Sequence, residues 1–247
     1  MPLYKTEAIV IRTIKLGEAD KIATLFTNEL GKVRAVAKGV RRTKSRFGSA
    51  LEPFTHINTG IFIKGSSSLY RMRDTGIIHS YHKIREDINK IAYGLYLLEL
   101  VDRFLLEGDV NKGVFAFLKD TLDFLGERED VKEIFILFGL HFLRLSGYQY
   151  KFDRCISCGD DPLIAFFSPH KGGLICNGCI RGEQRGMFPI NKAVALYLNS
   201  VKNIDGMIIE PANTDIVNEA AEIIKGIFTE IIGRPLLTQE FINEIKG

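Results

Sequence analysis

The sequence predicts an α+β protein in which a small five-stranded barrel precedes a helical region with an inserted four-cysteine module. Turn signals recur roughly every ten residues through the first 80 positions, the apolar period becomes helical from Arg85, and all four cysteines fall within residues 155–179. The chain of 247 residues is 46% hydrophobic and 26% charged. This is ordinary globular composition, with enough apolar material for a sizeable core.

The first 80 residues contain five segments that alternate as strands do. These segments are residues 7–13, 21–27, 32–38, 54–64 and 69–80. Five short strands in about 80 residues fit an OB-type barrel, whose exposed face and loops commonly bind oligonucleotides. Other small β-barrels share the pattern, so the pattern alone does not separate them. We expect residues 1–80 to form an OB-fold nucleic-acid-binding domain.

From residue 85 onward the apolar residues follow helical rows. The predicted helices cover residues 86–106, 114–125, 132–145, 191–201, 215–232 and 238–245. Asp102 is the one polar member of the apolar row of the first helix. Asn191 and Thr214 are predicted N-caps, and Gly233 is a predicted stop signal. We expect these helices to form a domain over residues 81–247.

Two C-x-x-C pairs are separated by seventeen residues, and this spacing is typical of structural zinc sites. Each pair lets one tight turn direct two thiolates at a single ion, and four thiolates complete a tetrahedron without an open position for water. We therefore expect a structural Zn²⁺ held by Cys155, Cys158, Cys176 and Cys179, in a module over residues 151–186 inserted in the helical domain. Two disulfides or four free thiols are the alternatives, and an intracellular chain disfavours the disulfides.

The net charge of +3 hides an asymmetry, because residues 1–80 carry 14 Lys and Arg against 6 Asp and Glu. Residues 32–46 contain seven of these cations and no acid. A basic strand face that continues into a basic loop suits a phosphate backbone, although basic runs are often only solvated surface. Phe47 in this loop either stacks on a base or folds back onto the barrel. The expected DNA contacts are Lys32, Arg34, Lys38, Arg41, Arg42, Lys44, Arg46, Arg71 and Arg73.

Catalytic motifs are missing from the sequence. It has no P-loop, dinucleotide-binding, zinc-protease, nucleophile-elbow or ligase lysine motif. No stretch reaches ~18 uninterrupted apolar residues, and no secretory signal is visible. We expect a protein that is not an enzyme, is cytoplasmic and nucleoid-associated, and makes no membrane contact. A protein–protein adaptor and an unrecognised nuclease or nucleotidyl transferase remain the alternatives.

Four segments carry a resemblance to a known family: YKTEAIV at 4–10, LGEADK at 16–21, GKVRAVAKG at 31–39 and LEPF at 51–54. Together with the order of barrel, helices and four-cysteine insertion, they resemble the bacterial RecO DNA-repair proteins. The resemblance implies a recombination mediator that binds single- and double-stranded DNA and anneals complementary strands. It also implies the partner RecR, contact of the helical domain with the C-terminal tail of single-strand-binding protein, and an indirect role in loading RecA.

Overall fold

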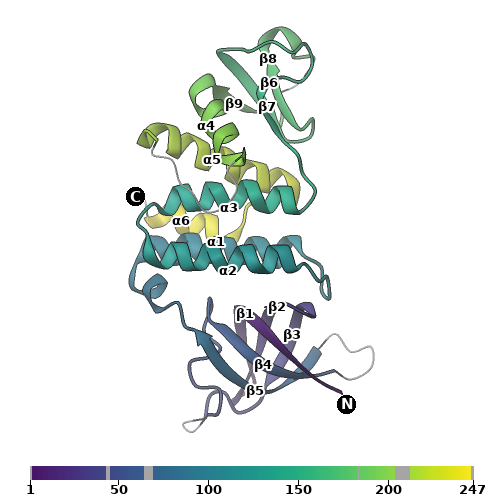
Figure 1. The fold of residues 1–247 in the computed structure, drawn as a ribbon, viewed down its shortest axis with the longest axis vertical. Coiled ribbons are helices and arrows are strands. Elements are labelled where there is room, and N and C mark those ends of the chain that lie inside the picture. The colour runs from purple at the N-terminus through teal and green to yellow at the C-terminus, as the bar shows by residue number, and fades with distance from the viewer. Residues whose placement is uncertain (1, 43–44, 64–68, 183, 204–211, 246–247) are drawn as a thin grey trace. The chain divides into compact units, whose positions relative to one another are not determined.

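The computed structural model describes residues 2–42, 45–63, 69–182, 184–203 and 212–245 (Figure 1). The chain forms two compact units, one made of residues 1–127 with 241–247 and the other of residues 128–240. A closed barrel comes first and the helices follow, so the predicted α+β class is confirmed.

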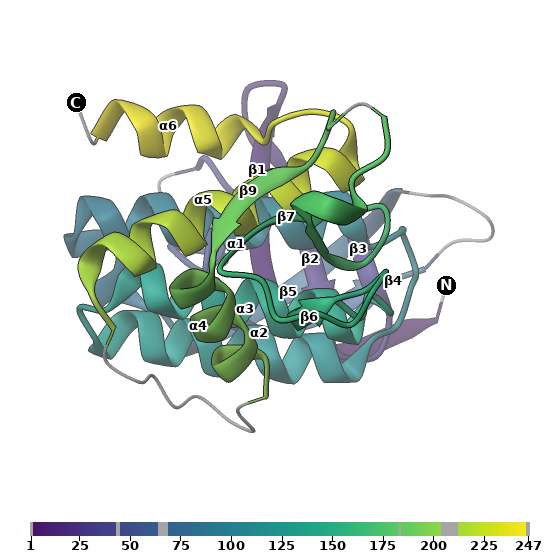
Figure 2. The same ribbon diagram turned by 90° about the horizontal axis from the view of Figure 1, so that it is seen from above.

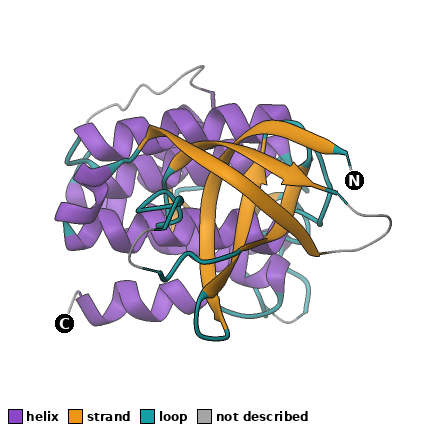
Figure 3. Cartoon of the chain, turned by 90° about the horizontal axis from the view of Figure 1, so that it is seen from below, coloured by secondary structure: helices purple, strands orange, loops and turns teal. Residues whose placement is uncertain are grey.

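The barrel is closed by β1 (Leu3–Leu16), β2 (Asp20–Thr27), β3 (Gly31–Ala37), β4 (His56–Phe62) and β5 (Leu69–His79). Their order around the barrel is β1-β2-β3-β5-β4, with β3 and β5 parallel and the other pairs antiparallel, which is an OB-type arrangement (Figure 3). Each of the five predicted strands corresponds to one of these strands.

Alternation along the strands separates the barrel core from the outer face. On β3, Val33 and Ala35 are buried in the core, whereas Arg34 between them is exposed. Phe47 is 2% exposed and belongs to the same core cluster, with the guanidinium of Arg46 5.0 Å from its ring centre. Phe47 therefore folds back onto the barrel, which is one of the two alternatives that the sequence left open.

The first unit also contains η1 (His82–Glu86), α1 (Ile88–Phe104) and α2 (Lys112–Glu127). Asp87 caps α1 by accepting a hydrogen bond from the Lys90 N–H at 2.8 Å. The ring of Phe115 on α2 meets the rings of Phe26 and His56 edge-on, at 5.7 and 6.0 Å. These helices pack on the barrel, so the compact unit that contains the barrel extends to Glu127.

The second unit combines helices with a small sheet (Figure 2). Its elements are α3 (Val131–Leu145), β6 (Lys151–Cys155), β7 (Ile164–Ser168), β8 (Gly173–Cys176), η2 (Asn177–Cys179), β9 (Phe188–Asn191), α4 (Lys192–Asn203) and α5 (Thr214–Ile232). The sheet order is β6-β8-β7-β9. The last helix, α6 (Leu237–Ile245), begins in this unit and ends in the first.

The predicted helix ends of the second unit are mostly confirmed. The Asn191 side chain accepts from the Val194 N–H at 3.0 Å, and Gly233 ends α5 with a φ of 78°. Thr214 is not the N-cap of α5, however, because the side chain of Asn213 accepts from the Asp215 N–H at 2.8 Å. No helix in the described part of the chain is both long and apolar enough to cross a membrane.

We predict that replacing Gly31 with Ala destabilises the first unit by about 3 kcal/mol, because a left-handed backbone strains the new residue and the added Cβ overpacks the site. Gly31 has a φ of 66°, and a Cβ there would lie 2.2 Å from the Asp109 carbonyl oxygen. The matched control is Gly17→Ala, since Gly17 has a φ of 57° and open space around its Cβ position. Thermal unfolding should show a clearly smaller loss for the control, and equal losses would contradict the close approach.

Candidate nucleic-acid interface and metal centre

The outward cations of the barrel differ in how far they are neutralised. Lys32 is 9% exposed, and its ammonium lies 3.2 Å from the Asp102 Oδ1 and also donates to the Asp102 carbonyl. The Nε of Arg12 lies 2.9 Å from the other carboxylate oxygen of Asp102. The structure therefore does not place Lys32 on an exposed basic face, because its ammonium is paired with Asp102 within the first unit.

The next outward cation of β3 is only partly neutralised. The Nε of Arg34 lies 2.7 Å from the Glu107 Oε1, and the two side chains are 44% and 43% exposed. An ion pair this open to water contributes little to stability and exchanges readily with another anion. Arg34 therefore remains on the surface as a candidate phosphate contact.

The loop that follows β3 carries the exposed cations. Lys38, Arg42 and Arg46 line a hollow of about 550 Å³ together with Asp20. The carboxylate of Asp20 accepts a hydrogen bond from the Gly39 N–H at 2.8 Å, which fixes the turn. Among the described residues, none of these three cations takes part in an ion pair. This hollow is thus a concentration of unpaired positive charge.

The remaining predicted contacts do not line this hollow. Arg41 is exposed, and its guanidinium donates to the carbonyls of Gly17 and Glu18 at 3.4 and 3.1 Å. Arg71 and Arg73 are exposed on either side of buried Met72, as expected for one outer strand face. Lys44 lies outside the described residues.

The four cysteines come together at one end of the small sheet. Cys155 ends β6, Cys176 ends β8, and Cys179 ends η2. All four sulfur atoms lie within 4.8 Å of one another, and the sulfurs of Cys158 and Cys176 are 3.7 Å apart. That separation is too long for a disulfide bond and close to the edge of about 3.8 Å of a tetrahedron with Zn–S bonds near 2.3 Å. The donor set therefore fits one tetrahedral metal ion.

Backbone N–H groups around the cluster favour the thiolate form of Cys155, its buried member. Cys155 is 2% exposed, and its sulfur accepts from the Cys176 N–H at 3.4 Å. Burial raises the pKa of Cys155, but N–H groups of Cys176, Cys158 and Ser157 outweigh it and lower the pKa to about 6. His170 is not part of the cluster, because its side chain is 70% exposed and its Nε2 lies 3.4 Å from Glu230.

These features define a two-unit protein with an OB-type barrel and a four-cysteine module in its helical unit. Residues 1–81 match the family model "Recombination protein O N terminal", and residues 85–240 match "Recombination protein O C terminal". The chain belongs to the RecO family of DNA repair proteins.

Similarity to individual relatives extends over whole chains. The chain is 32% identical over 252 residues to DNA repair protein RecO of Thermoanaerobacter sp. (strain X514), which covers 100% of both chains. It is 34% identical over 250 residues to DNA repair protein RecO of Geobacter metallireducens, which covers 100% of this chain and 99% of the relative.

We predict that Asp102→Asn destabilises the protein by about 2 kcal/mol, because it leaves the buried Lys32 ammonium without its counter-charge. The control is Glu107→Gln, which breaks the exposed pair with Arg34 and should cost less than about 1 kcal/mol. Denaturant unfolding measures both changes. An Asp102→Asn loss no larger than that of the control would show that Lys32 is not held in this way.

Proposed function

We propose that the chain binds single- and double-stranded DNA through the barrel loop of residues 38–46 and anneals complementary strands. The observation that carries the proposal is the hollow lined by Lys38, Arg42 and Arg46, whose charges have no carboxylate partner among the described residues. Arg34, Arg41, Arg71 and Arg73 are further candidate contacts on the barrel, although Arg34 and Arg73 have exposed ion pairs with Glu107 and Asp74. Lys44 is a further contact by sequence.

The mechanism is electrostatic. Cations at the loop replace the counterions of the phosphates, which reduces the repulsion between two strands that approach each other. Base pairing then supplies the driving force, so annealing needs neither nucleotide hydrolysis nor a catalytic residue. On this proposal the protein is not an enzyme, and it acts in the cytoplasm at the nucleoid.

Family membership supports a mediator role. We infer that the chain acts with RecR, contacts the C-terminal tail of single-strand-binding protein, and thereby assists RecA indirectly in loading onto coated DNA. The relatives are all named DNA repair proteins, which is consistent with such a role in recombination.

We also propose that the four cysteines hold a structural Zn²⁺. Four thiolates fill a tetrahedral shell, so the ion would supply rigidity and no catalytic position. The strands that carry the ligands have only four or five residues each, so metal binding would contribute much of the folding free energy of this sheet.

The DNA proposal predicts that the double variant Arg42→Gln/Arg46→Gln loses affinity for single-stranded DNA. Each phosphate contact to a single strand contributes about 0.7 to the slope of log K against log salt, so the slope should fall by about 1.4 and the affinity by about tenfold near 0.1 M salt. Fluorescence anisotropy with a labelled 30-mer of thymidine measures both quantities.

The matched control is Lys83→Gln with Lys112→Gln, which removes two exposed cations from the same unit away from the loop. The control should bind as the unaltered protein does. If both double variants bind equally well, the loop is not the site.

The metal proposal predicts one zinc per chain and a fall in melting temperature of about 10 °C or more when a chelator removes it, since a loss of several kcal/mol shifts a chain of this size by that amount. Cys158→Ser should have the same effect, whereas Ser157→Ala in the same exposed turn should keep both metal and stability. Elemental analysis and thermal unfolding test this. A metal-free protein with unchanged melting would refute a structural ion.

A further inference from the structure

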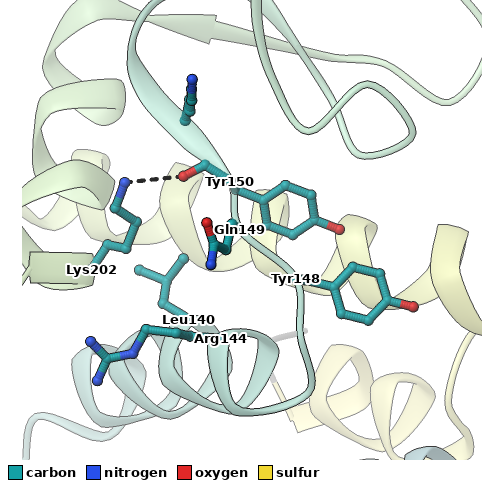
Figure 4. Close-up of a pocket in the computed structure, with 7 residues that line it drawn as sticks. Leu140, Arg144, Tyr148, Gln149, Tyr150 and Lys202 are labelled. Carbon is teal, nitrogen blue, oxygen red and sulfur yellow. Dashed lines mark hydrogen bonds between the residues drawn. The ribbon is translucent and has the colours of Figure 1, made fainter.

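The second unit contains a basic hollow that the barrel proposal does not use. It has a volume of about 300 Å³ and lies where α3, α4 and the loop before β6 meet (Figure 4). Its lining includes Leu140, Arg144, Tyr148, Tyr150, Lys151 and Lys202. The lining contains three cations and no carboxylate, so the hollow is suited to an anionic ligand.

The three cations of this hollow are held apart from acidic residues. The Lys202 Nζ donates to the Tyr150 carbonyl at 3.0 Å, as Figure 4 shows, and the Arg144 Nη2 lies 3.1 Å from the His141 Nδ1. Lys151 is exposed. Among the described residues, none of the three takes part in an ion pair. Like charges gathered without counter-charges attract anions.

A second hollow of about 490 Å³ adjoins the first and shares Tyr148 and Tyr150 with it. It adds Lys171 and His170, and its one carboxylate, that of Glu230, lies 3.4 Å from His170. The loop of residues 147–151, called the ridge below, thus separates a hollow with three cations from one in which Lys171 is offset by Glu230. Figure 4 shows the two tyrosine rings on one side of the loop backbone and Lys202 and Arg144 on the other.

The ridge presents a supported aromatic ring. Tyr148 is 37% exposed, and its ring stacks on that of Tyr150 with centres 6.1 Å apart. Tyr150 is 5% exposed and packs edge-on against Phe167 at 5.2 Å. Because the inner ring is fixed by the core, the outer ring is an ordered surface on which a nucleobase can stack.

We propose that this ridge is a second contact for single-stranded DNA, with phosphates at Arg144, Lys151 and Lys202 and a base on Tyr148. The inference rests on the proposed annealing function, which requires that two strands be held by one protein. Three cations beside an exposed aromatic ring match a polymer of alternating phosphates and bases better than a compact anion.

The test uses two ridge variants of the full chain. One is the double variant Arg144→Gln/Lys151→Gln, and the other is the single variant Tyr148→Leu. The control is Arg185→Gln with Arg234→Gln, which removes two exposed cations from the same unit outside both hollows. Thermal unfolding first establishes that each variant folds. The readouts are the annealing rate of two complementary labelled strands and the photocrosslinks of a single strand that contains 5-iodouracil.

The ridge variants should anneal about tenfold more slowly than the control, whereas the affinity for one short strand should change less than about twofold, because the barrel loop still binds it. In the unaltered protein the photocrosslink should map to residues 147–151. Annealing at the control rate together with no crosslink in this segment would overturn the inference.

Failure of this inference differs from failure of the barrel proposal. If Arg42→Gln with Arg46→Gln leaves single-strand affinity unchanged, the barrel proposal fails, whatever the ridge does. If only the ridge variants behave as the control, the ridge proposal alone fails. A further arm uses a synthetic hexapeptide of Asp and Phe. Binding of that peptide, lost in the ridge variants while annealing stays normal, would assign the hollow to protein docking and overturn the DNA assignment.

Discussion

The carboxylate of Asp102 is the interaction on which the charge pattern of the first unit depends. It joins α1 to two strands of the barrel, with Arg12 at 2.9 Å and Lys32 at 3.2 Å. A largely buried ammonium is tolerated only where it is paired, so this contact both attaches the helix and removes one cation from the outer face. Beyond the end of β3, Asp20 lines the hollow but forms no ion pair with Lys38, Arg42 or Arg46 among the described residues, and these three cations stay exposed. Lys32 on β3 is thus a structural cation, whereas Lys38 and the cations of the following loop remain accessible to an anionic ligand.

The sequence predicted what depends on neighbours along the chain. Period-two alternation located all five barrel strands and placed Arg71 and Arg73 together on one face. It also placed Lys32 and Arg34 on one face, but it could not show that α1, seventy residues later, covers part of that face. The one visible signal was Asp102, the single polar residue in an apolar helical row, and such a residue needs a partner inside the protein.

The small sheet also shows which features can be predicted from neighbouring residues and which cannot. Neither β6 nor β9 was predicted. β9 contains Pro189, which usually argues against a strand. The cysteine cluster was predicted nevertheless, since two C-x-x-C turns fix their ligands locally and only one hairpin is needed to bring them together. The hollow around Tyr148 could not be predicted in this way, because α3, α4 and the loop before β6 each contribute part of it.

The net charge of a region does not decide whether that region can bind a polyanion. Residues 81–247 carry 19 Lys and Arg against 24 Asp and Glu, which would suggest repulsion from DNA. At physiological ionic strength, however, exposed charges are screened beyond about 8 Å, so a ligand senses mainly the groups nearest to it. What matters is then whether nearby cations are already paired. Within the described part of the chain Lys32 is paired, whereas Arg42 and Arg46 in one unit and Arg144 and Lys151 in the other have no ion pair. On the proposed function, separate clusters of this kind would hold DNA strands locally and release them readily, because each contact is weak and sensitive to salt.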